Sequence, residues 1–128
     1  MNPPSFLTAS LLVALGGAIG AWLRFVSGRL IGPAAFPWST LTINVLGSLA
    51  MGLLAGWLAR QGTGGEHWRL LLGVGLLGGF TTFSAFSLEI VLLIERGALA
   101  LAALYAATSV AGGIAGLFLG LALTRSAA

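Results

Sequence analysis

The chain has 128 residues, of which 58% are hydrophobic and 7% charged, with a formal net charge of +3. A soluble domain carries about 25% charged residues, so this composition excludes an ordinary soluble protein and predicts an all-α membrane protein. The absence of cysteine excludes disulfides and thiolate metal sites, and the six arginines form no basic cluster that would suit nucleic acid.

Four apolar runs are long enough to cross a bilayer as helices, which requires about 18 residues or more. They lie at about 6–29, 38–59, 68–95 and 98–123, so we expect a single transmembrane domain over residues 1–128. The N-terminus lacks the positive start and the small-residue cleavage site of a signal peptide. We therefore expect the first run to be retained as a span.

Each run contains glycines four residues apart, a spacing that lets helix backbones approach closely in lipid. The pairs are Gly16/Gly20, Gly52/Gly56 and Gly75/Gly79, with Gly112, Gly116 and Gly120 in the last run. This pattern predicts tight helix packing. Because four short spans bury little surface, it also favours an oligomer.

The arginines are divided equally between the two sides of the membrane that four spans define. Arg24, Arg29 and Arg96 fall on one side, and Arg60, Arg69 and Arg125 fall on the other. The orientation in which a membrane protein inserts depends mainly on an asymmetry of Lys and Arg between its loops. A three-to-three division therefore favours neither orientation. We expect dual insertion and an antiparallel homodimer with a two-fold axis in the membrane plane; the alternative is a coincidental tie, with orientation set by other signals.

The second run contains a polar stripe, because Thr40, Asn44 and Ser48 recur every four residues and so share one helix face. The Asn44 amide could donate to an anion within the membrane. The alternative is that it bridges two helices, a common use of a membrane asparagine.

The third run contains the segment GGFTTFSAFS at residues 78–87, close to the expected bilayer midplane. Glycine and threonine are poor helix-interior residues, so this composition predicts a broken third helix. Free carbonyls at such a break form ion sites in transporters, and two breaks meeting on a dimer axis could enclose a hard cation such as Na⁺. A structural break without an ion is the alternative.

Phenylalanines recur every third residue in this segment, at Phe80, Phe83 and Phe86. The positive edges of aromatic rings can attract an anion without carrying a charge, although packing is the more frequent use of a membrane phenylalanine. Four interleaved hydroxyl residues favour the anion interpretation. They are Thr81, Thr82, Ser84 and Ser87.

The fourth run adds Tyr105, Thr108 and Ser109 on one face, although each hydroxyl could instead bond to its own helix. With the second and third runs, these groups predict a narrow path of neutral donors that favours anions. Arg24 could concentrate anions at a pore mouth or reach lipid headgroups instead. Glu89 is the only acid inside a span, and we expect it to pair with an arginine.

Three segments resemble the Fluc family of fluoride channels. GGFTTFSAFS is similar to the family signature GGLTTFSTFS, and GAIGAWLRF and TLTINVLGS are similar to its first-span and second-span segments. The sequence departs from the signature at Phe80 and Ala85. The resemblance covers essentially the whole chain.

The resemblance implies a passive fluoride channel in the bacterial inner membrane, built as a dual-topology homodimer with two antiparallel pores and a central structural Na⁺. It places the sodium carbonyls on Gly78 and Thr81. It implies a fluoride pathway formed by Phe83, Phe86, Asn44, Thr82, Tyr105, Ser109 and Arg24.

Two other classes of membrane protein deserve comparison. A proton-coupled small multidrug exporter requires a carboxylate in the first span, and none is present there. A non-conducting scaffold subunit would leave the polar stripes unexplained. An enzyme is not expected, because three acids and one loop histidine assemble no catalytic constellation.

Overall fold

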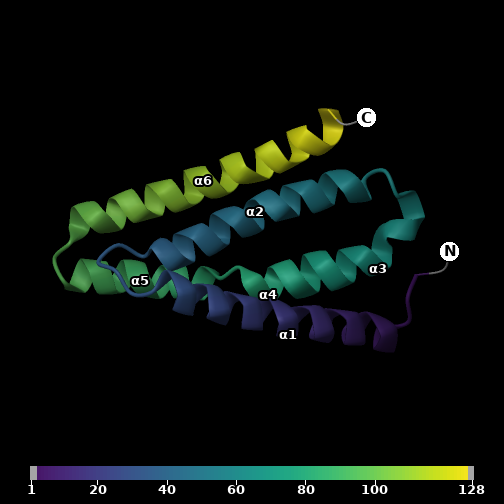
Figure 1. Ribbon diagram of the computed structural model, residues 1–128, viewed down its shortest axis with the longest axis horizontal. Helices are drawn as coiled ribbons and strands as arrows, with labels where there is room; N and C mark the ends of the chain where they lie inside the picture. Colours follow the sequence, from purple (N-terminus) through teal and green to yellow (C-terminus); the bar gives the residue numbers. More distant parts are fainter. Residues whose placement is uncertain (1–2, 127–128) are drawn as a thin grey trace.

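A computed structural model describes residues 3–126 as an all-helical chain (Figure 1). Its elements are α1 (Phe6–Ile31), α2 (Trp38–Leu58), η1 (Gly62–Gly65), α3 (Glu66–Trp68), η2 (Arg69–Leu77), α4 (Gly78–Phe80), α5 (Phe83–Glu95) and α6 (Leu99–Ser126). Four segments are long and apolar enough to cross a membrane: Phe6–Ile31, Trp38–Leu58, Glu66–Glu95 and Leu99–Ser126. The prediction of four spans is confirmed.

The ends of these segments follow from local chemistry. The Ser5 side chain caps α1 by accepting a hydrogen bond from the Thr8 N–H at 3.2 Å. Gly32 ends α1 with a φ of 76°, a left-handed conformation that glycine adopts without strain. Pro37 stands directly before α2, and Gly97 makes the turn between α5 and α6 with a φ of 74°.

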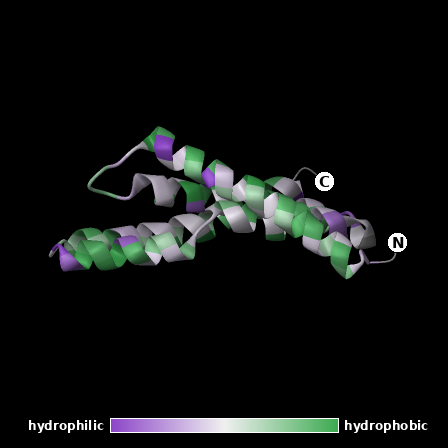
Figure 2. Cartoon of the chain, turned by 90° about the horizontal axis from the view of Figure 1, so that it is seen from below, coloured by the Kyte–Doolittle hydropathy of each residue, from purple (hydrophilic) through white to green (hydrophobic). Residues whose placement is uncertain are grey.

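The helices lie side by side in the order α6, α2, third segment and α1 (Figure 1). The start of α1, the end of α6 and the α2–η1 connection share one end of the bundle, while the α1–α2 and α5–α6 connections share the other. The helices are mostly white and green in Figure 2, with hydrophilic purple limited to short stretches. This arrangement places three arginines near each end of the bundle, consistent with the equal division along the sequence.

Glycines bring α1 into backbone contact with the third segment. A Cβ added to Gly16 would meet the Leu71 carbonyl oxygen, and one added to Gly75 would lie 3.0 Å from the Gly16 Cα. Gly20 and Gly79 make equally close approaches across the same contact. The predicted tight packing is confirmed at this interface, where a Cβ at any of these four glycines would collide with the facing backbone.

Close contacts at glycines also join α2 to α6. A Cβ on Gly52 would meet the Leu117 carbonyl oxygen, and one on Gly56 would meet the Thr124 hydroxyl. Gly120 in turn contacts the backbone at Leu49. Two glycine-mediated contacts therefore fix the bundle as two helix pairs, α1 with η2/α4 and α2 with α6.

The third segment is not uniformly α-helical. Arg69–Leu77 winds as a π-helix, and the Gly78 N–H donates to the Gly73 carbonyl five residues back. α4 ends at Phe80, and Thr81 and Thr82 are extended, with φ/ψ of −78°/158° and −150°/122°. α5 then begins at Phe83. Backbone groups that a continuous helix would pair internally must find other partners here.

Candidate functional site

Asn44 of α2 holds the extended residue Thr82 through both of its backbone groups. The Thr82 N–H donates to the Asn44 Oδ1 at 2.8 Å, and the Asn44 Nδ2 donates to the Thr82 carbonyl at 2.9 Å. A single amide side chain therefore satisfies a donor and an acceptor that would otherwise be buried without partners. The bridging use of Asn44 is present, and its amide retains a second N–H.

Two carbonyls lose their usual helical partners at this point. The Thr82 N–H would bond to the Gly78 carbonyl in a continuous helix but is held by Asn44. The Ala85 N–H would bond to the Thr81 carbonyl but donates to the Thr82 Oγ1 at 3.2 Å. These are the carbonyls that the resemblance assigns to sodium, and Gly78 is exposed on the surface of the chain.

The hydroxyls of the motif have specific local tasks. Thr81 bonds back to the Leu77 carbonyl at 2.9 Å, and Ser87 bonds back to the Phe83 carbonyl at 2.9 Å. Thr82 caps α5, and its Oγ1 lies 3.3 Å from the Ser84 Oγ. Ser84 is thus the hydroxyl of the motif least committed to its own backbone.

The two phenylalanines after the break occupy different surroundings. Their ring centroids lie 5.7 Å apart, but 79% of Phe83 is exposed on the surface of the chain. Phe86 is partly buried, with its ring centroid 5.2 Å from that of Tyr105. Phe83 therefore lies on the surface of the chain, whereas Phe86 packs inside it.

Glu89 does not pair with an arginine, so that prediction is wrong. The Thr40 hydroxyl donates to one carboxylate oxygen at 2.7 Å, and the Tyr105 hydroxyl donates to the other at 2.6 Å. The one ion pair among residues 3–126 joins Arg69 to Glu66. Two hydroxyl donors from α2 and α6 converge on Glu89 and make an arginine partner unnecessary.

Of the predicted pathway residues on α6, Tyr105 contacts this acid and Ser109 follows it along the helix. Tyr105 is fully buried, and the Ser109 Oγ, one turn further along α6, is buried without a hydrogen-bond partner in the described part of the chain. Thr108 instead bonds to its own helix at the Leu104 carbonyl, 2.7 Å away. A buried hydroxyl without a partner is available to a small ligand.

Three hollows succeed one another from the break towards the α1–α2 connection. The first has a volume of about 240 Å³ and is lined by Asn44, Ser48, Thr81, Thr82 and Phe83. The second, about 300 Å³, shares Thr82 with the first and includes Arg24 and Arg29. The third, about 310 Å³, shares Gly28 and Ser39 with the second.

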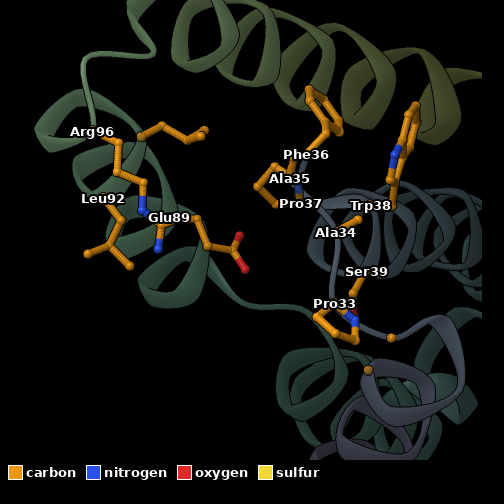
Figure 3. Close-up of a pocket in the computed structure, with 13 residues that line it drawn as sticks. Pro33, Ala34, Ala35, Phe36, Pro37, Trp38, Ser39, Glu89, Leu92 and Arg96 are labelled. Atoms are coloured by element: carbon orange, nitrogen blue, oxygen red, sulfur yellow. The ribbon is translucent and has the colours of Figure 1, made fainter.

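The third hollow is shown in Figure 3. Glu89, Leu92 and Arg96 line one side, and residues of the α1–α2 connection line the other. Arg24, Arg29 and Arg96 therefore all border this series of hollows, which gives it positive charge at one end of the bundle.

The chemistry of the site is that of neutral hydrogen-bond donors, aromatic edges and nearby arginines. No cluster of three or more His, Cys, Asp or Glu side chains that could hold a metal occurs within residues 3–126. The structure brings Asn44, Thr82, Phe83 and Phe86 together at the break, with Arg24 bordering the adjoining hollow. The sequence did not predict the hydrogen bond from Thr40 to Glu89. Thr40 nevertheless belongs to the polar stripe that contains Asn44.

Fold and site together define a four-span helical membrane protein with a polar network around an interrupted third segment. The family described as "CrcB-like protein, Camphor Resistance (CrcB)" matches residues 11–121. The chain belongs to this family.

Three relatives are each named "Fluoride-specific ion channel FluC". The relative from Novosphingobium aromaticivorans is 65% identical over 127 residues, which cover 95% of this chain and 100% of the relative. The relative from Rhodopseudomonas palustris is 59% identical over 120 residues, which cover 91% of this chain and 96% of the relative. The relative from Erythrobacter litoralis is 57% identical over 131 aligned positions, which cover 96% of this chain and 95% of the relative.

Proposed function

We propose that the chain forms a fluoride-selective channel that lets fluoride leave the bacterial cytoplasm passively and so lowers its toxicity. The observation that carries the proposal is the 65% identity to a fluoride-specific channel over nearly the full length of both chains. The site supports it independently, because neutral donors and ring edges surround the break.

The chemistry of the site suits a small anion that forms strong hydrogen bonds. Fluoride entering the series of hollows would exchange water for the free N–H of Asn44, hydroxyls and the edges of Phe83 and Phe86. A fixed positive charge at the break would retain the ion, whereas Arg24 at the hollow beside it attracts the ion without binding it at the centre. Tyr105 and Ser109 continue the path along α6.

The proposal includes an antiparallel homodimer with two pores. A single protomer leaves Phe83 and Gly78 exposed, so the site is incomplete without a second copy. The equal division of arginines between the two ends supports insertion in both orientations. A two-fold axis in the membrane plane would bring the two Thr81–Thr82 breaks together near the midplane.

The proposal also includes a central structural Na⁺ on this axis. The Gly78 and Thr81 carbonyls fit such an ion, because side chains have captured the N–H groups that would otherwise bond to them. Two copies supply four such oxygens, and oxygen is the ligand that hard cations prefer. We expect the purified dimer to dissociate faster in buffers in which N-methylglucamine replaces Na⁺; equal dissociation rates would remove the ion from the proposal.

Ion efflux from liposomes containing the purified protein tests the function. We expect rapid fluoride efflux, little chloride efflux and no dependence on a proton gradient. Equal flux of both anions, or none, would contradict a fluoride channel. Flux that requires a proton gradient would indicate a coupled exporter instead.

A further inference from the structure

An aromatic series extends from the break to the α1–α2 connection. The ring centroids of Phe83 and Phe86 lie 5.7 Å apart, and those of Phe86 and Tyr105 lie 5.2 Å apart. The series continues from Tyr105 to Phe36 at 5.5 Å and from Phe36 to Trp38 at 4.6 Å. Phe36 thus connects the predicted fluoride site to a segment outside the helices.

Two rings fix the orientation of Tyr105. Phe86 meets it at an interplanar angle of 61° and Phe36 at 78°, both edge-on arrangements. Tyr105 has no exposed surface, and its hydroxyl donates to the Glu89 carboxylate at 2.6 Å. The position of this charged group therefore depends on a ring that lies between two phenylalanines.

The backbone of the connection presents Phe36 to Tyr105. Gly32 turns the chain with a φ of 76°, and the Trp38 N–H donates to the Phe36 carbonyl at 2.8 Å. Figure 3 shows Phe36 and Trp38 across the hollow from Glu89 and Arg96. Residues of the connection and the acid thus face one hollow of about 310 Å³.

We propose that Phe36 is a positioning residue of the fluoride pathway, which keeps the Tyr105 hydroxyl on Glu89 and so keeps the charge of this carboxylate, at the wall of the third hollow, partly compensated by a second donor. Without the Phe36 ring, Tyr105 is free to tilt, and the carboxylate at the wall of the hollow keeps only the Thr40 hydroxyl as a donor. A negative charge there repels an approaching anion. This inference rests on the proposed fluoride channel.

The test compares Phe36→Leu with Phe6→Leu, the same substitution at a phenylalanine that is 90% exposed. Loss of a hydrogen bond to a charged group corresponds to an effect of about tenfold or more, so we expect Phe36→Leu to lower fluoride efflux by at least about tenfold. Phe6→Leu should leave it unchanged. Adding Glu89→Gln to Phe36→Leu should restore most of the flux, because the repelling charge is then absent.

A second readout does not depend on flux. The chain has one tyrosine, so ring-labelled ¹³C-tyrosine gives a single Cζ resonance that reports on the Tyr105 hydroxyl. We expect Phe36→Leu to shift this resonance and Phe6→Leu not to. Where Phe36→Leu yields no folded dimer, Phe36→Met replaces it.

The two readouts distinguish the possible failures. An unshifted resonance, unchanged flux, or a flux loss that Glu89→Gln does not restore would overturn the positioning role. A wild-type protein that conducts no fluoride would overturn the proposed function, and the resonance alone would then decide whether Phe36 holds Tyr105.

Discussion

The two halves of the third segment differ in what they contact. The first half, η2 with α4, packs its glycines directly against the backbone of α1. The second half, α5, presents Phe83 at the surface of the chain and contributes Glu89 to a network of hydroxyls. One half thus holds the bundle together, and the other carries the polar and aromatic groups of the site.

The residues between the halves connect these roles. Thr81 and Thr82 are extended, and Asn44 holds Thr82 in place from α2. The glycine contacts of the first half fix where the break begins, and Asn44 and the Thr82 cap fix where α5 starts. A rigid anchor followed by a locally supported site is what precise recognition of a small ion requires.

Two changes should have the largest effects, and the first fills the glycine contact. In Gly20→Ala, the new Cβ would meet the Leu76 carbonyl and the Phe80 N–H, so backbone must move. Overpacking of this kind costs about 1–3 kcal/mol or more in the free energy of unfolding. Thermal unfolding in detergent should show this loss, whereas Gly17→Ala, whose Cβ lies 3.9 Å from the Gly75 carbonyl oxygen, should be close to wild type.

Removing the Asn44 amide should come next. Asn44→Ala leaves the Thr82 N–H and carbonyl without partners, at about 1–3 kcal/mol for each buried group. We expect fluoride efflux to fall by about a hundredfold or more, because the break is no longer held. Thr42→Val on the same helix makes a suitable control, and an Asn44→Ala protein with normal flux would refute the role of the amide.

Phe83→Ile should separate function from stability. Because Phe83 is mostly exposed on the protomer, its loss should change the free energy of unfolding of the protomer by no more than about 0.5 kcal/mol. Fluoride efflux should nevertheless fall about tenfold when the ring edge is lost, with the dimer intact on gel filtration. A large loss of stability with normal flux would show that Phe83 of α5 serves packing rather than the fluoride pathway.

The smallest effect concerns the cap of α5. Thr82→Val removes the Oγ1 that accepts from the Ala85 N–H and should cost about 1 kcal/mol. Fluoride efflux should fall only a fewfold, since Asn44 still holds the Thr82 backbone. Thr82→Ser keeps the hydroxyl acceptor, so its thermal unfolding in detergent should be close to wild type. If Thr82 acted only through its shape, Thr82→Val would be the more stable of the two variants.

Hydropathy and glycine spacing were sufficient to predict the four helices and their close contacts, because both depend on short-range patterns. The π-helical winding of Arg69–Leu77 has no such local signal. The same is true of the contacts made by Asn44 with Thr82 and by Thr40 with Glu89, which join residues 38 and 49 positions apart. Glu89 was assigned an arginine partner wrongly, because its hydroxyl donors come from two other helices.

The proposed channel requires oppositely inserted copies that meet at their breaks. The chain has no cysteine, so Gln61→Cys in the α2–η1 connection creates a single thiol at one end of the bundle. Labelling of intact cells with a membrane-impermeant maleimide should reach about half of the copies, because the arginines give no preferred orientation. Labelling of all copies, or of none, would contradict the antiparallel dimer.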